Sequence, residues 1–185
     1  MTDDQIPQEK TSRRGLWSIL IFVAVLAFLG FLALGLNRAQ EGPVQVGAPA
    51  PQFTLTTFDG DTYNTEEYAG QIIVVNFWAS WCKPCEQEAA ELEQAYQLYK
   101  DQGVIFLGVD YTDTEPEALA YLERFGITYP NGPDLRTAIS QAYRTRGVPE
   151  TYIIGPDGQI VAVMIGPYES LDDIIADIEL ALQEQ

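Results

Sequence analysis

Histidine is absent from this chain of 185 residues, and cysteine occurs only twice. A structural zinc site needs four ligands, drawn mostly from cysteine and histidine. Because this chain supplies only two such residues, it could form a zinc site only together with another molecule. Cys82 and Cys85 are also too close in sequence for a bridge between them to add much conformational stability. We therefore expect no metal and interpret the pair as reactive cysteines; the alternative is two buried, inert cysteines.

Basic residues are scarce as well. The chain has 10 Lys and Arg against 27 Asp and Glu, a formal net charge of −17. Three residues of each sign precede position 15, so the rest of the chain carries the whole net charge. A field of this sign repels phosphate backbones and anionic lipid surfaces, which argues against a nucleic-acid partner. Solubility accounts for most of the charge.

One stretch contains no charge at all. Residues 16–36 are 21 uncharged residues rich in Leu, Ile, Val, Phe and Ala. About 20 apolar residues match the hydrocarbon core of a bilayer, and a helix is the only single segment that satisfies its own backbone there. The sequence therefore predicts one transmembrane helix over residues 16–36.

The residues beside this stretch predict its orientation. Lys10, Arg13 and Arg14 precede it, whereas only Arg38 follows closely. Because positive residues stay on the cytoplasmic side, we expect a cytoplasmic N-terminal tail and an extracytoplasmic C-terminal domain. The alternative is a cleaved signal peptide, with a cleavage site near residues 33–35, but the apolar stretch is longer than such peptides use.

The remaining chain predicts a single α/β domain. We assign residues 1–15 to the tail, 37–46 to a tether and 47–185 to the extracytoplasmic domain. Apolar runs and helical spacing alternate along that domain, which indicates helices packed on a mixed sheet. The predicted strands are 53–57, 62–63, 72–78, 104–109, 151–154 and 159–165; the predicted helices are 83–101, 115–125, 139–145 and 171–183, with a helical turn at 65–68.

The cysteines occupy the segment Trp-Cys-Lys-Pro-Cys, residues 81–85, between a predicted strand and a predicted helix. Free N–H groups and the positive dipole end at a helix start stabilise a thiolate. We therefore predict Cys82 as the nucleophile and Cys85, one turn later, as the resolving thiol. Three neighbours are predicted to shape the site: Lys83 by lowering the pKa of Cys82, Pro84 by stiffening the turn, and Trp81 by covering it.

Two segments resemble the thioredoxin superfamily. Residues 74–85 (V-V-N-F-W-A-S-W-C-K-P-C) resemble its active-site segment, and residues 147–154 (G-V-P-E-T-Y-I-I) its cis-proline signature. The Pro-Glu-Thr version, together with residues 46–55 (V-G-A-P-A-P-Q-F-T-L), is similar to the membrane-anchored TlpA/ResA/CcmG (DsbE) group. Over residues 44–185 the resemblance implies a thioredoxin fold, a mixed central β-sheet flanked by helices, with an N-terminal β-hairpin extension.

The resemblance also implies roles for single residues. It implies a cis bond before Pro149, facing the cysteines. Many thioredoxins carry a buried aspartate where this chain has Asn76, whose amide cannot shuttle a proton. Glu150 is then the leading candidate for an acid beside the sulfurs; the alternative is a solvated loop carboxylate. Further expected members are Trp78, Trp81 and Val148 as an apolar substrate surface, Asp110 and Asp113 in a loop that shapes specificity, and Glu86 beside the helix dipole.

The expected function is reduction of disulfides in exported proteins at the outer face of the cell membrane. The resemblance implies apocytochrome c as substrate, through its C-x-x-C-H haem-attachment motif, and a transmembrane electron-donor protein as partner. We expect a monomer without a cofactor. The alternatives are a peroxiredoxin-like peroxide reductase, a disulfide oxidase, and a redox-sensing or chaperone-like binding module without turnover. The direction of exchange depends on the reduction potential.

Overall fold

The computed structural model describes residues 13–39 and 42–183. The chain divides into two compact units, Met1–Glu41 and Gly42–Gln185. Most of the predicted tail, residues 1–12, and residues 40–41 of the predicted tether lie outside the described residues.

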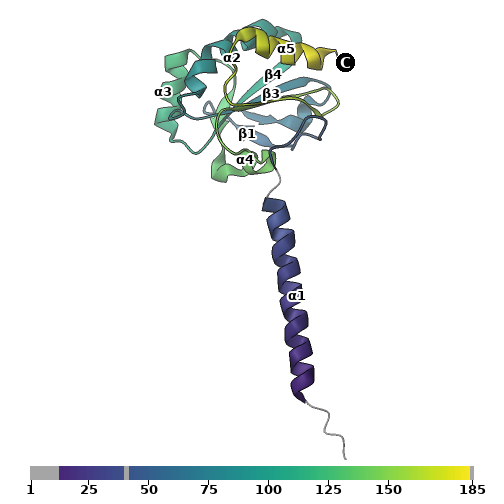
Figure 1. The fold of residues 1–185 in the computed structure, drawn as a ribbon. Helices are drawn as coiled ribbons and strands as arrows, with labels where there is room; N and C mark the ends of the chain where they lie inside the picture. Colours follow the sequence, from purple (N-terminus) through teal and green to yellow (C-terminus); the bar gives the residue numbers. More distant parts are fainter. Residues whose placement is uncertain (1–12, 40–41, 184–185) are drawn as a thin grey trace, which may run out of the picture. The chain divides into compact units, whose positions relative to one another are not determined.

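The first unit contains one helix, α1 (Arg13–Ala39), drawn in Figure 1. Large apolar side chains between Trp17 and Leu32 are exposed along it. Within the described residues, no helix is both long enough and apolar enough to cross a membrane. The membrane span over residues 16–36 stays a prediction.

The second unit is built on a five-stranded sheet with the order β5-β4-β3-β6-β7. Strands β3 (Ile72–Trp78), β4 (Val104–Asp110) and β5 (Asn131–Pro133) run parallel to one another. Strands β6 (Glu150–Ile154) and β7 (Ile160–Ile165) continue the sheet in antiparallel pairing. The sheet is therefore mixed, as predicted, and β3 lies at its centre.

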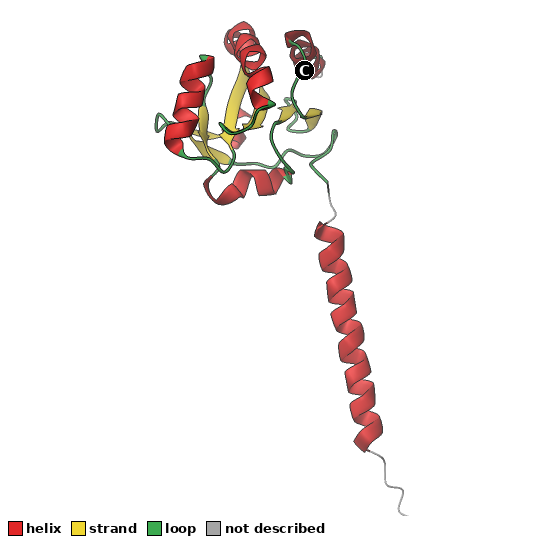
Figure 2. Cartoon of the chain, turned by 60° about the vertical axis from the view of Figure 1, so that its left-hand side comes forward, coloured by secondary structure: helices red, strands yellow, loops and turns green. Residues whose placement is uncertain are grey.

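Helices and a small hairpin cover the two faces of this sheet (Figure 2). Side chains from α2 (Cys85–Tyr99) and α5 (Leu171–Leu182) share one core with alternate residues of β3. Side chains before and within the hairpin of β1 (Thr54–Thr56) and β2 (Thr62–Asn64) share the other core with α4 (Ala138–Tyr143). Every residue of β3 is buried, because the strand is covered on both sides.

The predicted elements are confirmed with shifts at their ends. Helix α3 (Glu115–Phe125) and the short 3-10 helix η1 (Thr65–Tyr68) have the predicted bounds. Helix α2 is shorter than predicted, since it begins at Cys85 and gives way after Tyr99 to the 3-10 helix η2 (Lys100–Gln102). Tyr99 and Phe106 are buried in the core.

Strand β5 and the 3-10 helix η3 (Leu135–Thr137) were not predicted. The β5 sequence Asn-Gly-Pro is typical of a turn, but it pairs with Gly108 to Asp110 of β4. Gly108 allows this approach, because a Cβ atom there would overlap the side chain of Asn131. The pairing places Asn131 beside Trp78, the last residue of β3, at the end of the strand that leads to the cysteines.

Candidate active site

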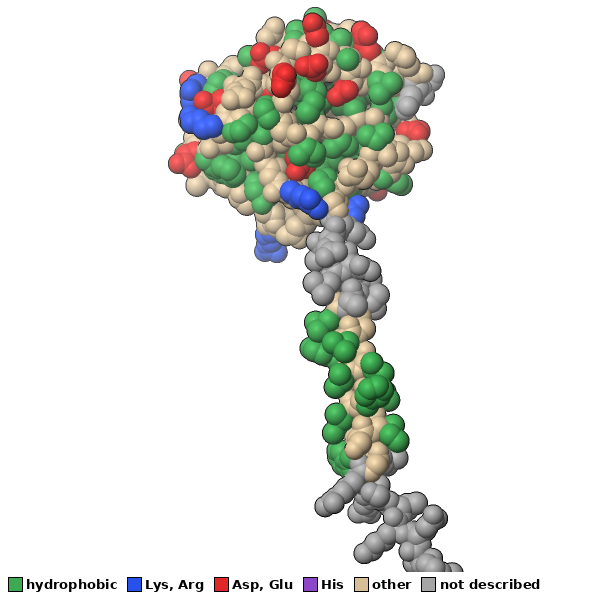
Figure 3. Space-filling model, viewed as in Figure 1, with side chains coloured by type: hydrophobic (Ala, Val, Ile, Leu, Met, Phe, Trp, Pro, Cys, Tyr) green, Lys and Arg blue, Asp and Glu red, His purple; other side chains and the backbone are tan. Residues whose placement is uncertain are grey.

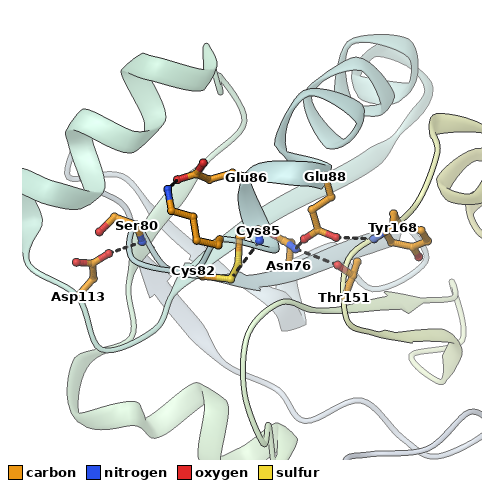
Figure 4. Close-up of a disulfide and its surroundings, with 10 residues drawn as sticks. Asn76, Ser80, Cys82, Cys85, Glu86, Glu88, Asp113, Thr151 and Tyr168 are labelled. Atoms are coloured by element: carbon orange, nitrogen blue, oxygen red, sulfur yellow. Dashed lines mark hydrogen bonds and ion pairs between the residues drawn. A yellow bond between two sulfur atoms is a disulfide. The ribbon is translucent and has the colours of Figure 1, made fainter.

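Cys82 and Cys85 form a disulfide with an S–S distance of 2.01 Å and a Cα–Cα distance of 5.3 Å. The bridge lies where β3 ends and α2 begins, and the Cys85 N–H donates a hydrogen bond to Cys82 Sγ at 3.1 Å (Figure 4). This N–H belongs to the first turn of α2, so the helix start contacts the sulfur of the predicted nucleophile. The Val148–Pro149 bond is cis, as the resemblance implied.

The disulfide is almost covered. Cys82 is 3% exposed and Cys85 is 1% exposed, and both share a small core with Ala89 of α2 and Ala118 of α3. Val148, beside the cis bond, packs against the same core. In the disulfide form little of either cysteine faces solvent.

Trp78 and Trp81 differ in exposure. Trp81 is 57% exposed and borders a pocket of about 360 Å³ shared with Tyr121 and Arg124 of α3. Trp78 is only 2% exposed, stacks on Tyr121 and donates from Nε1 to Asn131 Oδ1 at 2.7 Å. The prediction that Trp78 belongs to an exposed substrate surface is therefore wrong: it supports the site from beneath.

Lys83 forms a salt bridge with one acidic residue, Glu86. Its Nζ lies 2.8 Å from Glu86 Oε1, which also accepts from Arg124 at 3.4 Å. The Lys83 hydrogen bond is the main reason why the pKa of Glu86 lies below its ordinary value. The acidic partner opposes the charge of Lys83, and the predicted effect of Lys83 on the pKa of Cys82 stays a prediction. Pro84 immediately precedes α2 in helical conformation, as predicted for a residue that stiffens this turn.

The loop after β4 is fastened to the active-site turn. Asp113 Oδ2 accepts from the Ser80 N–H at 2.6 Å, and its Oδ1 accepts from the Thr114 N–H. The Thr112 carbonyl accepts from Trp81 Nε1 at 3.3 Å, although Thr112 has a left-handed backbone with φ 47°. Asp113 therefore positions the residues immediately before Cys82, which gives the predicted loop residue a specific contact.

A buried polar group lies behind Cys85. Asn76 donates from Nδ2 to Glu88 Oε1 and to Thr151 Oγ1, each at 2.9 Å. The second oxygen of Glu88 accepts from the Tyr168 N–H at 2.9 Å. In Figure 4, Glu88 extends from α2 toward Asn76 and Tyr168, on the opposite side of the disulfide from Asp113. The position of the missing aspartate is thus linked to a carboxyl group contributed by the neighbouring helix.

Glu88 has an unusual ionisation. It is 1% exposed, and burial raises its pKa to about 7, against smaller opposing effects from the hydrogen bonds of Tyr168 and Asn76. A group with such a pKa exchanges protons near neutral pH, which suits acid–base chemistry beside a thiol. Our reading of the sequence missed it. The available signal was its spacing from Cys85 and Leu92, which places it on the buried stripe of α2.

Glu150 is buried, so the alternative of a solvated loop carboxylate is wrong. It opens β6, directly after the cis bond. Its Oε1 accepts from the Arg146 N–H at 2.9 Å, and its Oε2 accepts from the Tyr152 hydroxyl at 2.8 Å. One oxygen thus contacts the segment before Pro149 and the other contacts Tyr152 of β6, and a role beside the sulfurs stays a prediction.

No group of three or more Cys, Asp or Glu within residues 13–39 and 42–183 is arranged to hold a metal ion. The chemistry available at this site is that of two sulfurs that join and separate, a helix start that supports a thiolate, and a buried carboxyl that holds a proton near neutral pH.

Comparisons with known proteins agree with this chemistry. The model of the AhpC/TSA family matches residues 46–163. Thiol-disulfide oxidoreductase ResA of Geobacillus kaustophilus is 31% identical over 157 residues, covering 85% of this chain and 90% of that protein. Thiol:disulfide interchange protein DsbE of Allochromatium vinosum is 35% identical over 165 residues, covering 86% and 88%.

A solved structure gives the same result for the fold. The crystal structure of a thiol:disulfide interchange protein of the thioredoxin family from Chlorobium tepidum TLS superposes with a TM-score of 0.67 at 27% identity. It covers 77% of this chain and 99% of that one. The chain therefore belongs to the AhpC/TSA family, as a thioredoxin-like thiol–disulfide oxidoreductase of the ResA and DsbE type.

Proposed function

We propose that this protein reduces disulfides in exported proteins outside the cytoplasm, with apocytochrome c as its substrate. The observation that carries the proposal is the Cys82–Cys85 pair at the start of α2, next to the cis bond at Pro149. The substrate follows from the resemblance of the Pro-Glu-Thr segment to proteins of cytochrome c maturation.

The reaction needs the reduced pair. The Cys82 thiolate attacks one sulfur of the substrate disulfide, and the other substrate sulfur leaves and takes up a proton. Cys85 then loses its proton and attacks the Cys82 sulfur of the mixed disulfide, which releases the second substrate thiol. Two electrons pass to the substrate, and the Cys82–Cys85 bridge is formed.

Glu88 is the group proposed to take the proton of Cys85. It lies one helical turn after Cys85, it is buried, and its pKa of about 7 allows it to accept a proton at neutral pH. A carboxylate near the sulfurs also disfavours the thiolate, which stabilises the disulfide relative to the reduced pair and favours a reductant.

The location proposed for the enzyme is the outer face of the cell membrane, with the N-terminus inside. Support comes from the 21 uncharged residues 16–36 and from the exposed apolar side chains of α1. Reduction outside the cytoplasm then requires an electron donor that crosses the membrane, which we propose as the second partner. The enzyme is proposed to act as a monomer.

Turnover with an oxidised C-x-x-C-H peptide tests the proposal. The reduced protein should convert one peptide disulfide per Cys pair, and repeatedly if a dithiol is supplied. Cys85→Ser should stop at the mixed disulfide with the peptide, and Cys82→Ser should abolish reaction. Absence of peptide reduction would exclude the reductase, and consumption of hydrogen peroxide instead would favour the peroxidase alternative.

A further inference from the structure

A pocket of about 260 Å³ opens beside the active-site turn, between the end of β4 and the segment 133–137. Three carboxylates line it, Asp110, Asp113 and Asp134, and Arg136 is the one cation among its lining residues. The last residues of this segment are strained, since Arg136 and Thr137 both have left-handed backbones, with φ of 62° and 55°.

Asp110 is the carboxylate with an oxygen that accepts no hydrogen bond. It is 3% exposed, and its Oδ1 has no hydrogen-bond partner. The other two carboxylates are occupied by the protein's own donors: Asp113 by Ser80 and Thr114, and Asp134 by Ile139 and Ser140. A buried oxygen without a donor is costly, so a group that donates a hydrogen bond to Asp110 Oδ1 would be favoured in this pocket.

The pocket is joined to the place where substrate reacts. Asp110 pairs in register with Trp78, the last residue of β3. Asp113 and Thr112, which line the pocket, accept hydrogen bonds from Ser80 and Trp81, the two residues before Cys82. These hydrogen bonds join the lining of the pocket to the turn that precedes Cys82.

The charges that line the pocket determine which kind of chemical group can bind in it. Burial and the carboxylates of Asp113 and Asp134 raise the pKa of Asp110 to about 8, and a cation at Oδ1 would reverse that shift. The three acids are not arranged as metal ligands in the part of the chain that the structure describes. A primary ammonium or a guanidinium on a flexible stem reaches such a pocket and supplies several donors.

We propose that the Asp110–Asp113–Asp134 pocket binds a lysine or arginine side chain of the substrate, next to its reacting disulfide. The inference rests on the proposed function and adds the substrate class: a disulfide flanked by a basic residue. The chain's net charge of −17 would attract such substrates before they dock.

Paired oxidised peptides test the proposal with the full chain in neutral detergent micelles. Both peptides of a pair carry one C-x-x-C disulfide, and they differ only in having Lys or Gln at one flanking position. Across the series of pairs, that position is moved to each neighbour of the reacting cysteine in turn. We expect one or more positions at which Lys raises kcat/KM about tenfold over Gln. Equal rates at every position would overturn the inference while leaving the reductase in place; no reduction of any peptide would instead remove the proposed function.

Asp110→Asn should bring the ratio of Lys to Gln rates close to one. Asp101→Asn, the same substitution on the exposed η2 segment at the opposite end of β4, should keep it. Because both peptides meet the same protein, a general loss of activity cancels in the ratio. A preference that survives Asp110→Asn would contradict the proposal.

The unmodified protein provides a second test. Asp113, Asp134 and Arg136 are the charged groups that line the pocket with Asp110. As Asp110 ionises, the ratio of Lys to Gln rates should rise between about pH 6 and pH 9, since the lysine remains charged. Effects of pH on the cysteines act on both peptides alike, so a ratio that stays flat would contradict the proposal.

Discussion

At the scale of single residues, burial sets the charge of Glu88. Its pKa is about 7 in the folded protein and near 4.5 when the side chain is free. The unfolded chain therefore releases this proton at lower pH than the folded one. As pH rises from 4.5 to 7, the free energy of unfolding falls by about 3 kcal/mol on account of Glu88.

Glu88→Gln should remove this dependence, because an amide stays neutral at every pH. We expect the variant's unfolding free energy, relative to the unmodified protein, to increase by about 3 kcal/mol between pH 4 and pH 8. Urea unfolding of the oxidised protein at several pH values measures it. Glu123→Gln, at an exposed position of α3, is the matched control and should show no such trend.

The chemistry of Glu88 makes a separate prediction. If Glu88 takes the proton of Cys85, Glu88→Gln should slow the release of substrate from the mixed disulfide by tenfold or more at pH 7. The formation of that mixed disulfide should change less. Rapid-quench measurement of the two steps separates them, and equal rates of release in both proteins would exclude Glu88 from the step.

The prediction that Cys82 and Cys85 are the reactive pair rested on residue type alone, since the chain has no other cysteines. The acid was harder to predict. Glu150 follows the cis-proline in sequence, but its carboxylate turns to Arg146 and Tyr152. Glu88 looked like one of several helix-surface acids, and only the packing of α2 against Asn76 and Tyr168 buries it. Burial of one polar residue depends on neighbours far apart in the sequence.

At the scale of elements, the contact between β4 and β5 holds the floor of the site. Asn131 accepts from Trp78 and donates from Nδ2 to the Tyr129 carbonyl, and it lies against Gly108. Any side chain at Gly108 would displace Asn131 and leave the buried Trp78 N–H without its acceptor.

Gly108→Ala should therefore lower the free energy of unfolding by about 2 kcal/mol or more, through crowding and the lost hydrogen bond. Denaturant unfolding measures the change, and the near-ultraviolet signal of the tryptophans should shift with it. Gly147→Ala is the control, since a Cβ atom there meets nothing within 4 Å and its φ is not positive. An unchanged free energy of unfolding for Gly108→Ala would show that Asn131 can shift without loss of stability.

The loop after β4 provides the second prediction for an element. Asp113→Ala removes the acceptor of the Ser80 and Thr114 N–H groups. We expect a loss of about 1 kcal/mol in stability and faster hydrogen exchange at Ser80. Asp59→Ala, in the exposed turn of the hairpin, is the control. Unchanged exchange at Ser80 would show that the loop does not hold the active-site turn.

Elements with strong periodicity were predictable, because their spacing decides which face is buried. Helices α3 and α5 belong to this group, whereas strand β3 was predictable from its continuous apolar run. Strand β5 was not predictable, since three residues of turn-forming type become a strand only by pairing with β4. The sequence also did not predict that α2 ends at Tyr99. The η2 segment that follows ends at Gly103, whose φ of 79° sets the turn there.

At the scale of the whole chain, acidity belongs to the second unit. Figure 3 shows Asp and Glu side chains gathered over α2 and α5, with few Lys and Arg on the same face. The run of uncharged residues 16–36 contrasts with this surface. Composition alone separates these two parts of the chain, and it is the basis of the predicted membrane span. Among the described residues, no helix is both long enough and apolar enough to establish that span.

Fractionation tests that span. We expect the full chain to stay with membranes after alkaline carbonate washing, because about 20 apolar residues hold a helix in the bilayer. A chain without residues 16–36 should be released. Protease added from outside should digest the thioredoxin-like domain while leaving the N-terminal residues protected. Release of the full chain, or the reverse pattern of protection, would contradict the proposed topology.

The reduction potential of the Cys82–Cys85 pair tests the central claim most directly. It is measured on the full chain by titration in thiol–disulfide buffers at pH 7. For a reductant of exported proteins we predict a value near or below about −220 mV. A value near about −120 mV would contradict the account, because a pair with that potential donates its disulfide and would make the protein an oxidase.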